Sequence, residues 1–128
     1  MESWACKKIY EQKELLISMG LSKPADKVIF ADLKVETHFN SLSEEDWLKK
    51  ALRRAINDFK ENAFCGERIK KELIPKEYIK KYNIDNLLWY PLPNAWRLVY
   101  SIFSDEKELF VMIVEYYDHK EYERRFHY

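Results

Sequence analysis

The sequence predicts an α+β fold: a two-layer sandwich with an antiparallel meander sheet, an N-terminal strand and packed helices. Apolar residues recur at helical spacing from Trp47 to Phe59, which indicates one amphipathic helix wide enough to cover a sheet. Three strand-like apolar runs follow near the C-terminus, and their short connections favour antiparallel hairpins. A shorter run at 27–31 predicts the N-terminal strand.

The chain has 128 residues, of which 47% are hydrophobic and 16% aromatic, so it can bury one substantial core. We expect one domain at 23–128, preceded by an N-terminal helical extension at 1–22. Apolar residues in the extension have near-helical spacing, and Gly20 is a suitable stop. The extension could cover a groove of the domain or contact a second copy of the chain in a homodimer.

In the first half of the domain, one or two helical turns are expected at 33–42, with Leu33, Phe39 and Leu42 inward. The helix at 47–59 follows Ser43, a typical N-cap residue. The acidic residues after Ser43 would then lie in the first turn, where the helix dipole stabilises them.

The second half begins with a short helix expected at 76–82. Leu87–Tyr90, Trp96–Ile102 and Leu109–Val114 are the expected meander strands. A closing helix is expected at 119–126.

The net charge of 0 conceals a basic block, because residues 49–81 hold eleven basic and five acidic side chains, a local charge of +6. Such a block can attract a polyanion, or it can be a solvated helix face. Its candidate phosphate-binding cations are Lys49, Lys50, Arg53, Arg54, Lys70 and Lys71.

Several function classes are disfavoured by composition. Cys6 and Cys65 are too few and too far apart for a disulfide framework or a zinc site, and we expect no metal or other cofactor. Two glycines are too few for a Gly-rich nucleotide loop. No secretion signal or membrane-length apolar run is present, so a cytoplasmic location is expected.

Arg97 is the most informative residue, because it interrupts an otherwise apolar strand. Alternation places Trp96, Leu98 and Tyr100 against the helix and Arg97 on the opposite, open face. A guanidinium there could bind phosphate through its planar fork. It could equally pair with a cross-strand carboxylate such as Glu115.

His119 and Tyr122 follow the last strand and are spaced to share one side of a helix. A histidine can move a proton near neutral pH, Arg97 could stabilise a phosphorane, and Tyr122 could assist, so the three suit phosphodiester cleavage. Asp118 could orient the imidazole. The competing interpretation is a surface histidine in a helix cap.

Further cations and aromatic rings near the C-terminus suit single-stranded RNA. They are Tyr117, Lys120, Arg124 and Arg125.

Three blocks of the sequence resemble the RelE/ParE superfamily of toxin–antitoxin toxins, over about residues 27–126. They are Trp96-Arg97-Leu98-Val99-Tyr100, the C-terminal run Asp118-His119-Lys120-Glu121-Tyr122-Glu123-Arg124-Arg125-Phe126, and the segment from Gly66 through Lys70-Lys71-Glu72-Leu73-Ile74-Pro75 to Asn86-Leu87.

The resemblance implies a RelE-like toxin of a type II system, with a concave sheet face that cleaves mRNA without a metal, often on the ribosome. It implies a cognate antitoxin that wraps the toxin. Carried over to this chain, Arg97 would contact the scissile phosphate, and His119 and Tyr122 would act beside it.

The chain also departs from that pattern, because Leu87–Pro91 lacks the lysines that some family ribonucleases carry on this strand. A histidine-type mechanism therefore fits better than a lysine-dependent one. The alternative is a non-catalytic toxin-fold protein that acts by contact, as the gyrase poisons of the superfamily do.

Overall fold

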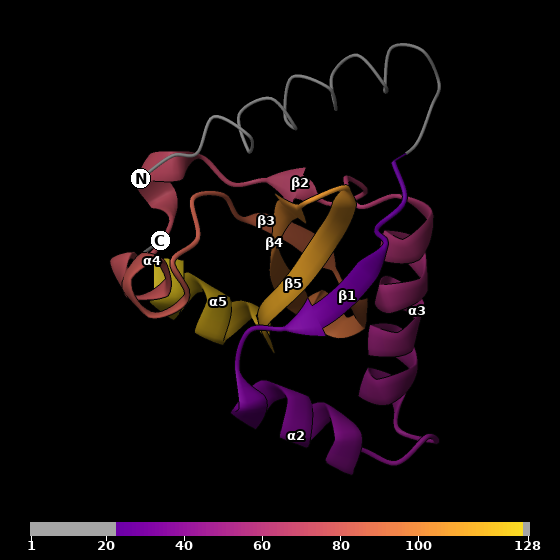
Figure 1. The fold of residues 1–128 in the computed structure, drawn as a ribbon. Coiled ribbons are helices and arrows are strands. Elements are labelled where there is room, and N and C mark those ends of the chain that lie inside the picture. The colour runs from indigo at the N-terminus through magenta and orange to yellow at the C-terminus, as the bar shows by residue number, and fades with distance from the viewer. Residues whose placement is uncertain (1–22, 127–128) are drawn as a thin grey trace.

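The computed structural model describes residues 23–126, so the helix expected within residues 1–22 lies outside the described residues. In chain order the elements are β1 (Lys27–Phe30), α2 (Leu33–Ser41), α3 (Trp47–Glu61), β2 (Glu67–Arg68), the 3₁₀ turn η1 (Lys71–Leu73), α4 (Lys76–Tyr82), β3 (Leu88–Pro91), the 3₁₀ turn η2 (Pro93–Ala95), β4 (Arg97–Asp105), β5 (Glu108–Tyr117) and α5 (His119–Phe126) (Figure 1).

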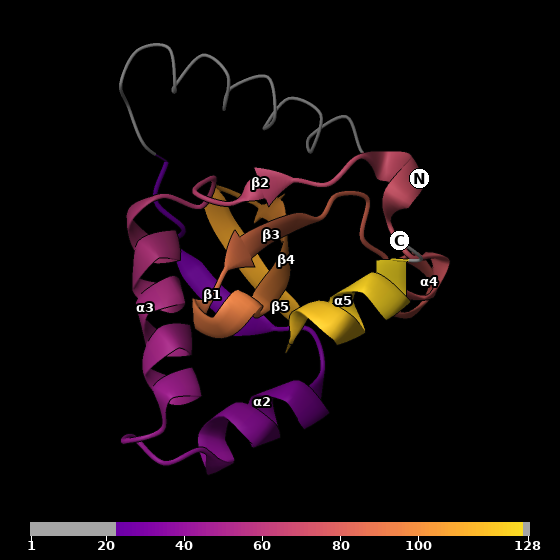
Figure 2. The same cartoon turned by 180° about the vertical axis from the view of Figure 1, so that it is seen from behind.

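The strands form one open sheet in the order β1-β5-β4-β3-β2 (Figures 1 and 2). The meander of β3, β4 and β5 is antiparallel, as the sequence predicts. β1 runs parallel to β5, which is possible because the two strands are far apart in the chain and no hairpin joins them. β2 pairs with β3 at the far edge, and its two residues are too few to show a sequence pattern. The α+β class is confirmed, with a mixed five-stranded sheet.

The predicted amphipathic helix, α3, packs on one face of the sheet. Its buried residues Leu52, Ala55 and Phe59 join Tyr100 and Ile102 in the main hydrophobic cluster. The helix begins three residues later than expected for a cap at Ser43. Asp46 is the cap, because its Oδ1 accepts the Leu48 N–H at 2.8 Å. In the preceding helix α2, Phe39 is buried but Leu33 is 75% exposed, contrary to expectation.

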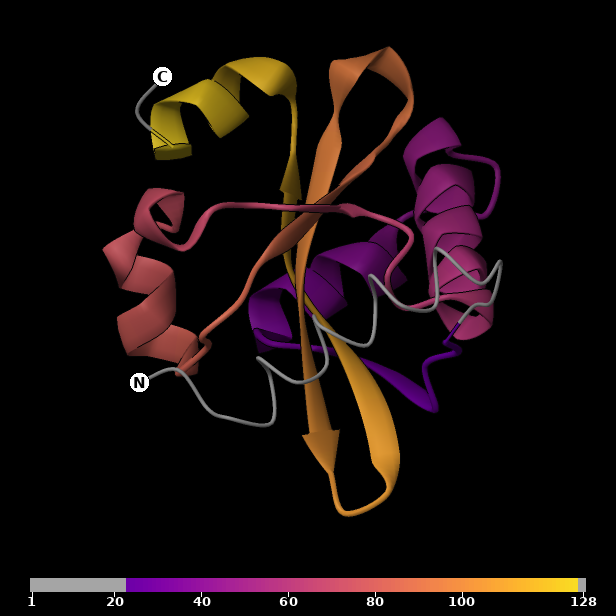
Figure 3. The same ribbon diagram turned by 90° about the horizontal axis from the view of Figure 1, so that it is seen from above.

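The second face of the sheet carries its own hydrophobic cluster, so helices lie on both sides of the sheet rather than in one layer (Figure 3). Alternate residues of β4 and β5 on this face, such as Val99 and Val114, are apolar and fully buried. Tyr78 of α4 and Tyr122 of α5 cover them. The face expected to be open at Arg97 is therefore largely closed, because apolar residues on both faces require cover on both faces.

A β-bulge decides which side chains of β5 reach this second face. Val99 lies opposite Glu115 whereas Tyr100 lies opposite Ile113, so Val114 is an extra residue in β5. The extra residue reverses the alternation, and the following residues Glu115 and Tyr117 turn toward α4 and α5. Without the bulge they would point to the other face.

Gly66 allows the closest backbone approach in the core. A Cβ at this position would lie 2.6 Å from the carbonyl oxygen of Trp89 and 2.7 Å from the Tyr100 hydroxyl oxygen. The same hydroxyl accepts the Gly66 N–H at 2.9 Å and donates to the Ala63 carbonyl at 2.9 Å. Gly66 thus lets the chain that leaves α3 reach β3 and β4.

We predict that Gly66→Ala lowers the free energy of unfolding by about 2–3 kcal/mol, because a backbone carbonyl cannot move aside cheaply. Urea unfolding followed by circular dichroism measures the change, with the exposed residue substitution Lys76→Ala as the control. Wild-type stability in Gly66→Ala would contradict the close contact.

Asp32 joins α2 to α4. Its carboxylate accepts the Lys81 ammonium at 2.9 Å, the Lys34 N–H at 2.8 Å and the Tyr82 hydroxyl at 3.0 Å. These donors, the Lys81 ammonium first, lower the pKa of Asp32 to about 2.

The lowered pKa predicts part of the acid sensitivity of the fold. An unfolded Asp has a pKa of about 3.9, so Asp32 stabilises the fold fully above that pH. This contribution is lost as the pH falls from about 4 towards 2. We therefore expect the melting temperature of wild type to fall over this interval more steeply than that of Asp32→Asn. Equal slopes for the two proteins would exclude this role.

Candidate functional site

The guanidinium of Arg97 lies between two aromatic rings. Its Cζ is 4.1 Å from the ring centre of Trp89 and 4.4 Å from the ring centre of Tyr122. Contacts of this kind engage the flat faces of a guanidinium and leave its in-plane N–H donors available. A fork oriented by two rings suits two oxygens of one phosphate.

The strand register produces this arrangement. Trp89 lies opposite Val99, the next residue of β4 on the same face as Arg97, so the two side chains are diagonal neighbours. Tyr122 comes from α5, which follows directly after Tyr117, the cross-strand partner of Arg97. Three consecutive strands and the last helix therefore converge on one guanidinium.

Arg97 does not pair with Glu115, the alternative that the sequence left open. Glu115 instead binds Arg125 Nη2 at 3.1 Å and accepts the Tyr78 hydroxyl. Within residues 23–126, no ion pair involves Arg97, whereas Arg53 and Arg125 are both held by glutamates. The charge of Arg97 is therefore not neutralised by a carboxylate of the described chain.

His119 is the first residue of α5 and is about half exposed. Its Nε2 lies 2.8 Å from Oε1 of Glu123, one helical turn later. Asp118 does not orient the imidazole as expected, because its Oδ1 accepts the Glu121 N–H at 2.9 Å and caps α5. Glu123 takes the orienting position instead. His119 and Tyr122 are three residues apart on α5, so the imidazole and the Arg97 guanidinium lie at the same end of the sheet.

Tyr122 is only 1% exposed, and its ring stacks on Phe126 with 4.4 Å between ring centres. Tyr117 is 5% exposed, and its hydroxyl lies 2.9 Å from that of Tyr78. Both tyrosines belong to the second cluster, and neither ring is placed to stack on a ligand. The structure gives Tyr122 the role of a ring beneath Arg97.

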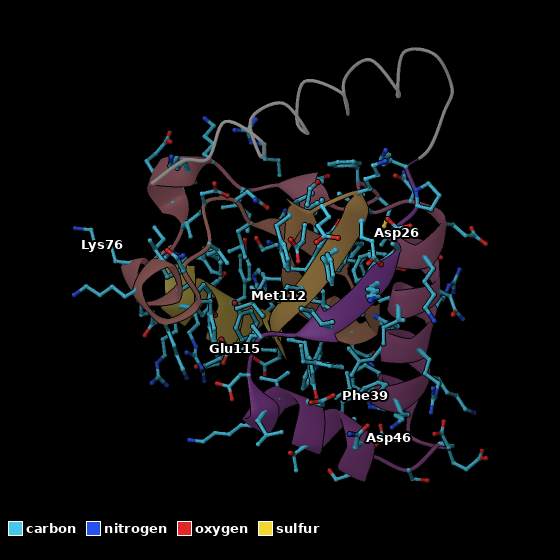
Figure 4. All side chains as sticks on the ribbon, in the orientation of Figure 1. Asp26, Phe39, Asp46, Lys76, Met112 and Glu115 are labelled. Atoms are coloured by element: carbon cyan, nitrogen blue, oxygen red, sulfur yellow. The ribbon has the colours of Figure 1, made fainter. Side chains whose placement is uncertain are left out.

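A polar network behind this cluster holds α4 and α5 to β5. Glu115 lies where β5 approaches these helices (Figure 4) and joins Tyr78 to Arg125. Burial first, and then the neighbouring Tyr117 and Glu115, raise the pKa of Tyr78, so its hydroxyl stays protonated and donates to the carboxylate. Arg125 also binds Glu121 at 3.2 Å. Its guanidinium is therefore part of this network and is not the exposed RNA-binding cation that the sequence predicts.

Most of the cations expected on α3 are engaged by neighbouring groups. Lys49 is 3% exposed, and its Nζ donates to the Phe39 carbonyl at 2.6 Å and lies over the Phe39 ring. Arg53 makes two hydrogen bonds to Glu44, and Lys50 lies 3.7 Å from Glu45. Arg54 is exposed. The +6 block is therefore only partly available to a polyanion.

The remaining predicted cations are on the surface. Lys70, Lys71 and Lys120 are exposed, and Arg124 is 81% exposed with Glu121 at 3.6 Å. Of these, Lys120 and Arg124 share α5 with His119. Lys70 precedes η1 and Lys71 is its first residue, on a separate segment.

A cleft of about 200 Å³ lies beside the polar network, between residues of α2, α4, β5 and α5. Its lining includes Asp32 with Lys81 and Glu115 with Arg125, which already neutralise each other. Neither Arg97 nor His119 lines it, so it is distinct from the Arg97 site.

Sequence reasoning missed two residues of the site, Trp89 and Glu123. Glu123 follows His119 by four residues, the spacing at which helical side chains pair, so it could have been preferred to Asp118. The sequence around Trp89 indicates only that its strand carries no lysine. Its contact with Arg97 depends on the register of β3 against β4, which sequence alone does not define.

In residues 23–126, no helix is both long and apolar enough to span a bilayer. In the same range, no three His, Cys, Asp or Glu side chains are grouped so that they could hold a metal ion.

The buried position of Tyr122 gives a test of its role. We predict that Tyr122→Phe keeps the ring beneath Arg97 and costs at most about 2 kcal/mol of unfolding free energy. Tyr122→Ala removes the ring and costs about 3–5 kcal/mol. Denaturant unfolding of both variants measures this. A Tyr122→Ala variant as stable as wild type would contradict the packing.

Comparison of the chain with protein-family models, with curated proteins and with solved structures gives no match.

Proposed function

We propose that this chain is a cytoplasmic endoribonuclease toxin of the RelE type, which cleaves single-stranded mRNA by attack of the 2′-hydroxyl and needs no metal. The observation that carries the proposal is the Arg97 guanidinium, oriented by Trp89 and Tyr122 and paired with no carboxylate of the described residues. The resemblance at the Arg97 strand and in the C-terminal run supports the same assignment.

The proposed reaction uses two side chains. His119 accepts the proton of the 2′-hydroxyl, the 2′-oxygen bonds to phosphorus, and the bond from phosphorus to the 5′-oxygen breaks. The proton then passes from the imidazolium to the leaving 5′-oxygen. Arg97 stabilises the additional negative charge of the phosphorane between these steps. The products are a 2′,3′-cyclic phosphate and a 5′-hydroxyl.

Glu123 is a positioning residue in this scheme. Its carboxylate lies 2.8 Å from Nε2 and fixes the orientation of the imidazole. Nδ1 is then the nitrogen that faces the substrate in this scheme. The proposed partners are mRNA, the ribosome and a cognate antitoxin protein that covers the site.

A second candidate is a non-catalytic protein of the same fold that acts by contact with another target. The burial of Tyr122 favours it, since one of the three expected catalytic side chains cannot reach a substrate in this conformation. Such a protein would bind a partner tightly and create no new RNA ends.

The decisive experiment incubates RNA with purified protein, alone and with translating ribosomes, and maps the new ends. We predict that Arg97→Ala and His119→Ala each reduce cleavage by about 10²–10⁴-fold and relieve growth arrest on induction. Arg97→Lys should recover little, because an ammonium keeps the charge but loses the fork.

Lys76→Ala is the matched control, because it removes a cation whose side chain points away from the body of the molecule (Figure 4). Circular dichroism of each variant checks the fold. Cleavage that persists in both folded site variants would reject this site. Growth arrest without new RNA ends in the wild type would favour the contact inhibitor.

A further inference from the structure

We propose that Trp47 forms a base-stacking subsite for RNA, on the opposite side of the β3–β4 turn from Arg97. The inference rests on the proposed function and extends it. It assigns the substrate as a single strand with an unpaired base beside the phosphate that Arg97 binds.

Trp47 is unusual among the aromatic side chains of the domain. It is 42% exposed, and every other Phe, Tyr and Trp in residues 23–126 is buried or half-buried. Large exposed rings at fixed positions are typical of binding surfaces, because they offer much contact area at a small loss of side-chain entropy. A nucleobase is one ligand that stacks on such a ring, and any of the four bases can do so because each has an aromatic face.

The ring of Trp47 is held in place by the sheet. Trp96 contacts it edge-on, with 5.5 Å between ring centres and 83° between ring planes. Trp47 is the first residue of α3, directly after the Asp46 cap, so its backbone is also fixed. A ring fixed before binding loses little freedom when a base stacks on it.

Trp96 connects this ring to the phosphate site. It directly precedes Arg97, and successive side chains of an extended chain point to opposite faces. Trp96 accordingly packs with the main cluster, whereas Arg97 reaches Trp89 and Tyr122. A strand of RNA with a phosphate on Arg97 would therefore pass round the turn at Pro93–Ala95, which is exposed, to place a neighbouring base on Trp47.

The local charges permit a polyanion at this position. The carboxylates of the loop before α3 are engaged: Glu44 by Arg53, Glu45 by Lys50, and Asp46 by the Leu48 N–H. Arg54, two turns after Trp47, lies on the same side of α3 and is exposed. An aromatic ring with a cation on the same helix face is a combination that suits a single strand, because the cation can bind the backbone that follows the stacked base.

The test measures binding without cleavage. The probe is a short, fluorescein-labelled 2′-O-methyl oligoribonucleotide, in which the attacking hydroxyl is blocked, and affinity is read by anisotropy. Trp47→Leu keeps an apolar side chain but removes the aromatic face, and it should weaken binding about 10-fold. Trp47→Phe should stay near wild type, and Leu33→Ala, an exposed apolar site on α2, is the matched control.

A second set of probes separates stacking from a structural effect. In these probes one base at a time is replaced by an abasic residue. At one position, wild type should bind the abasic probe about 10-fold more weakly than the intact probe. Trp47→Leu should bind that abasic probe and the intact probe equally well, because the stacking contact is already absent. The subsite would be overturned if the losses of affinity from Trp47→Leu and from base removal add at every position of the probe. It would also be overturned if Trp47→Leu binds the intact probe as tightly as wild type does.

The two proposals fail in different ways. Cleavage that needs Arg97 but is indifferent to Trp47 overturns the subsite and keeps the nuclease. A wild-type chain that neither binds the probe nor cleaves RNA overturns both. Self-association that Trp47→Leu abolishes, with no effect on the probe, would make the ring a contact between copies of the chain and overturn the subsite.

Discussion

The contact of Arg97 with Trp89 and Tyr122 joins the second hydrophobic cluster of this protein to its surface. Tyr122 is packed against Phe126 and Tyr117 on its buried side and carries the guanidinium on the other. The charge therefore rests on a packed base, and its position depends on how α5 docks against the sheet. Such rigidity is what a group that must meet charge in a transition state requires, because no reorganisation is then needed during reaction.

Docking of α5 depends in turn on one irregular residue in β5. The bulge at Val114 turns Glu115 and Tyr117 toward α4 and α5, and it thereby supplies the carboxylate that binds Tyr78 and Arg125. A regular β5 would send these groups to the α3 side, where Tyr100 and Ile113 fill the core. Bulges of this kind commonly redirect side chains next to functional sites. The site is thus a consequence of register as much as of residue type.

Sequence periodicity predicts the helices and strands that bury one regular stripe of apolar side chains. The meander, α3 and α5 follow from alternation and helical spacing, and α4 and α5 were expected at the residues where they occur. Residue pairing was harder to predict, because it depends on contacts between distant segments. Helical spacing places Lys49 on a polar face of α3. Its ammonium is nevertheless buried, because it donates to the Phe39 carbonyl and lies over the Phe39 ring. The sequence does not predict that Arg97 is covered, because a strand that holds one arginine is expected to be half-exposed. Trp89 contacts Arg97 only through the register of β3 against β4.

The same distant pairings change the electrostatic character of the molecule. A basic helix face would attract RNA through long-range charge, but Glu44 and Glu45 neutralise Arg53 and Lys50 on α3. With a net charge of 0, the chain has little field with which to collect a polyanion from solution. Under the proposed function, RNA would be recognised by short-range contacts at the Arg97 end of the sheet, with the phosphate on the guanidinium and a base on an indole ring. The proposed ribonuclease would therefore depend on a partner such as a ribosome to deliver the strand, because few phosphate contacts leave little affinity for free RNA.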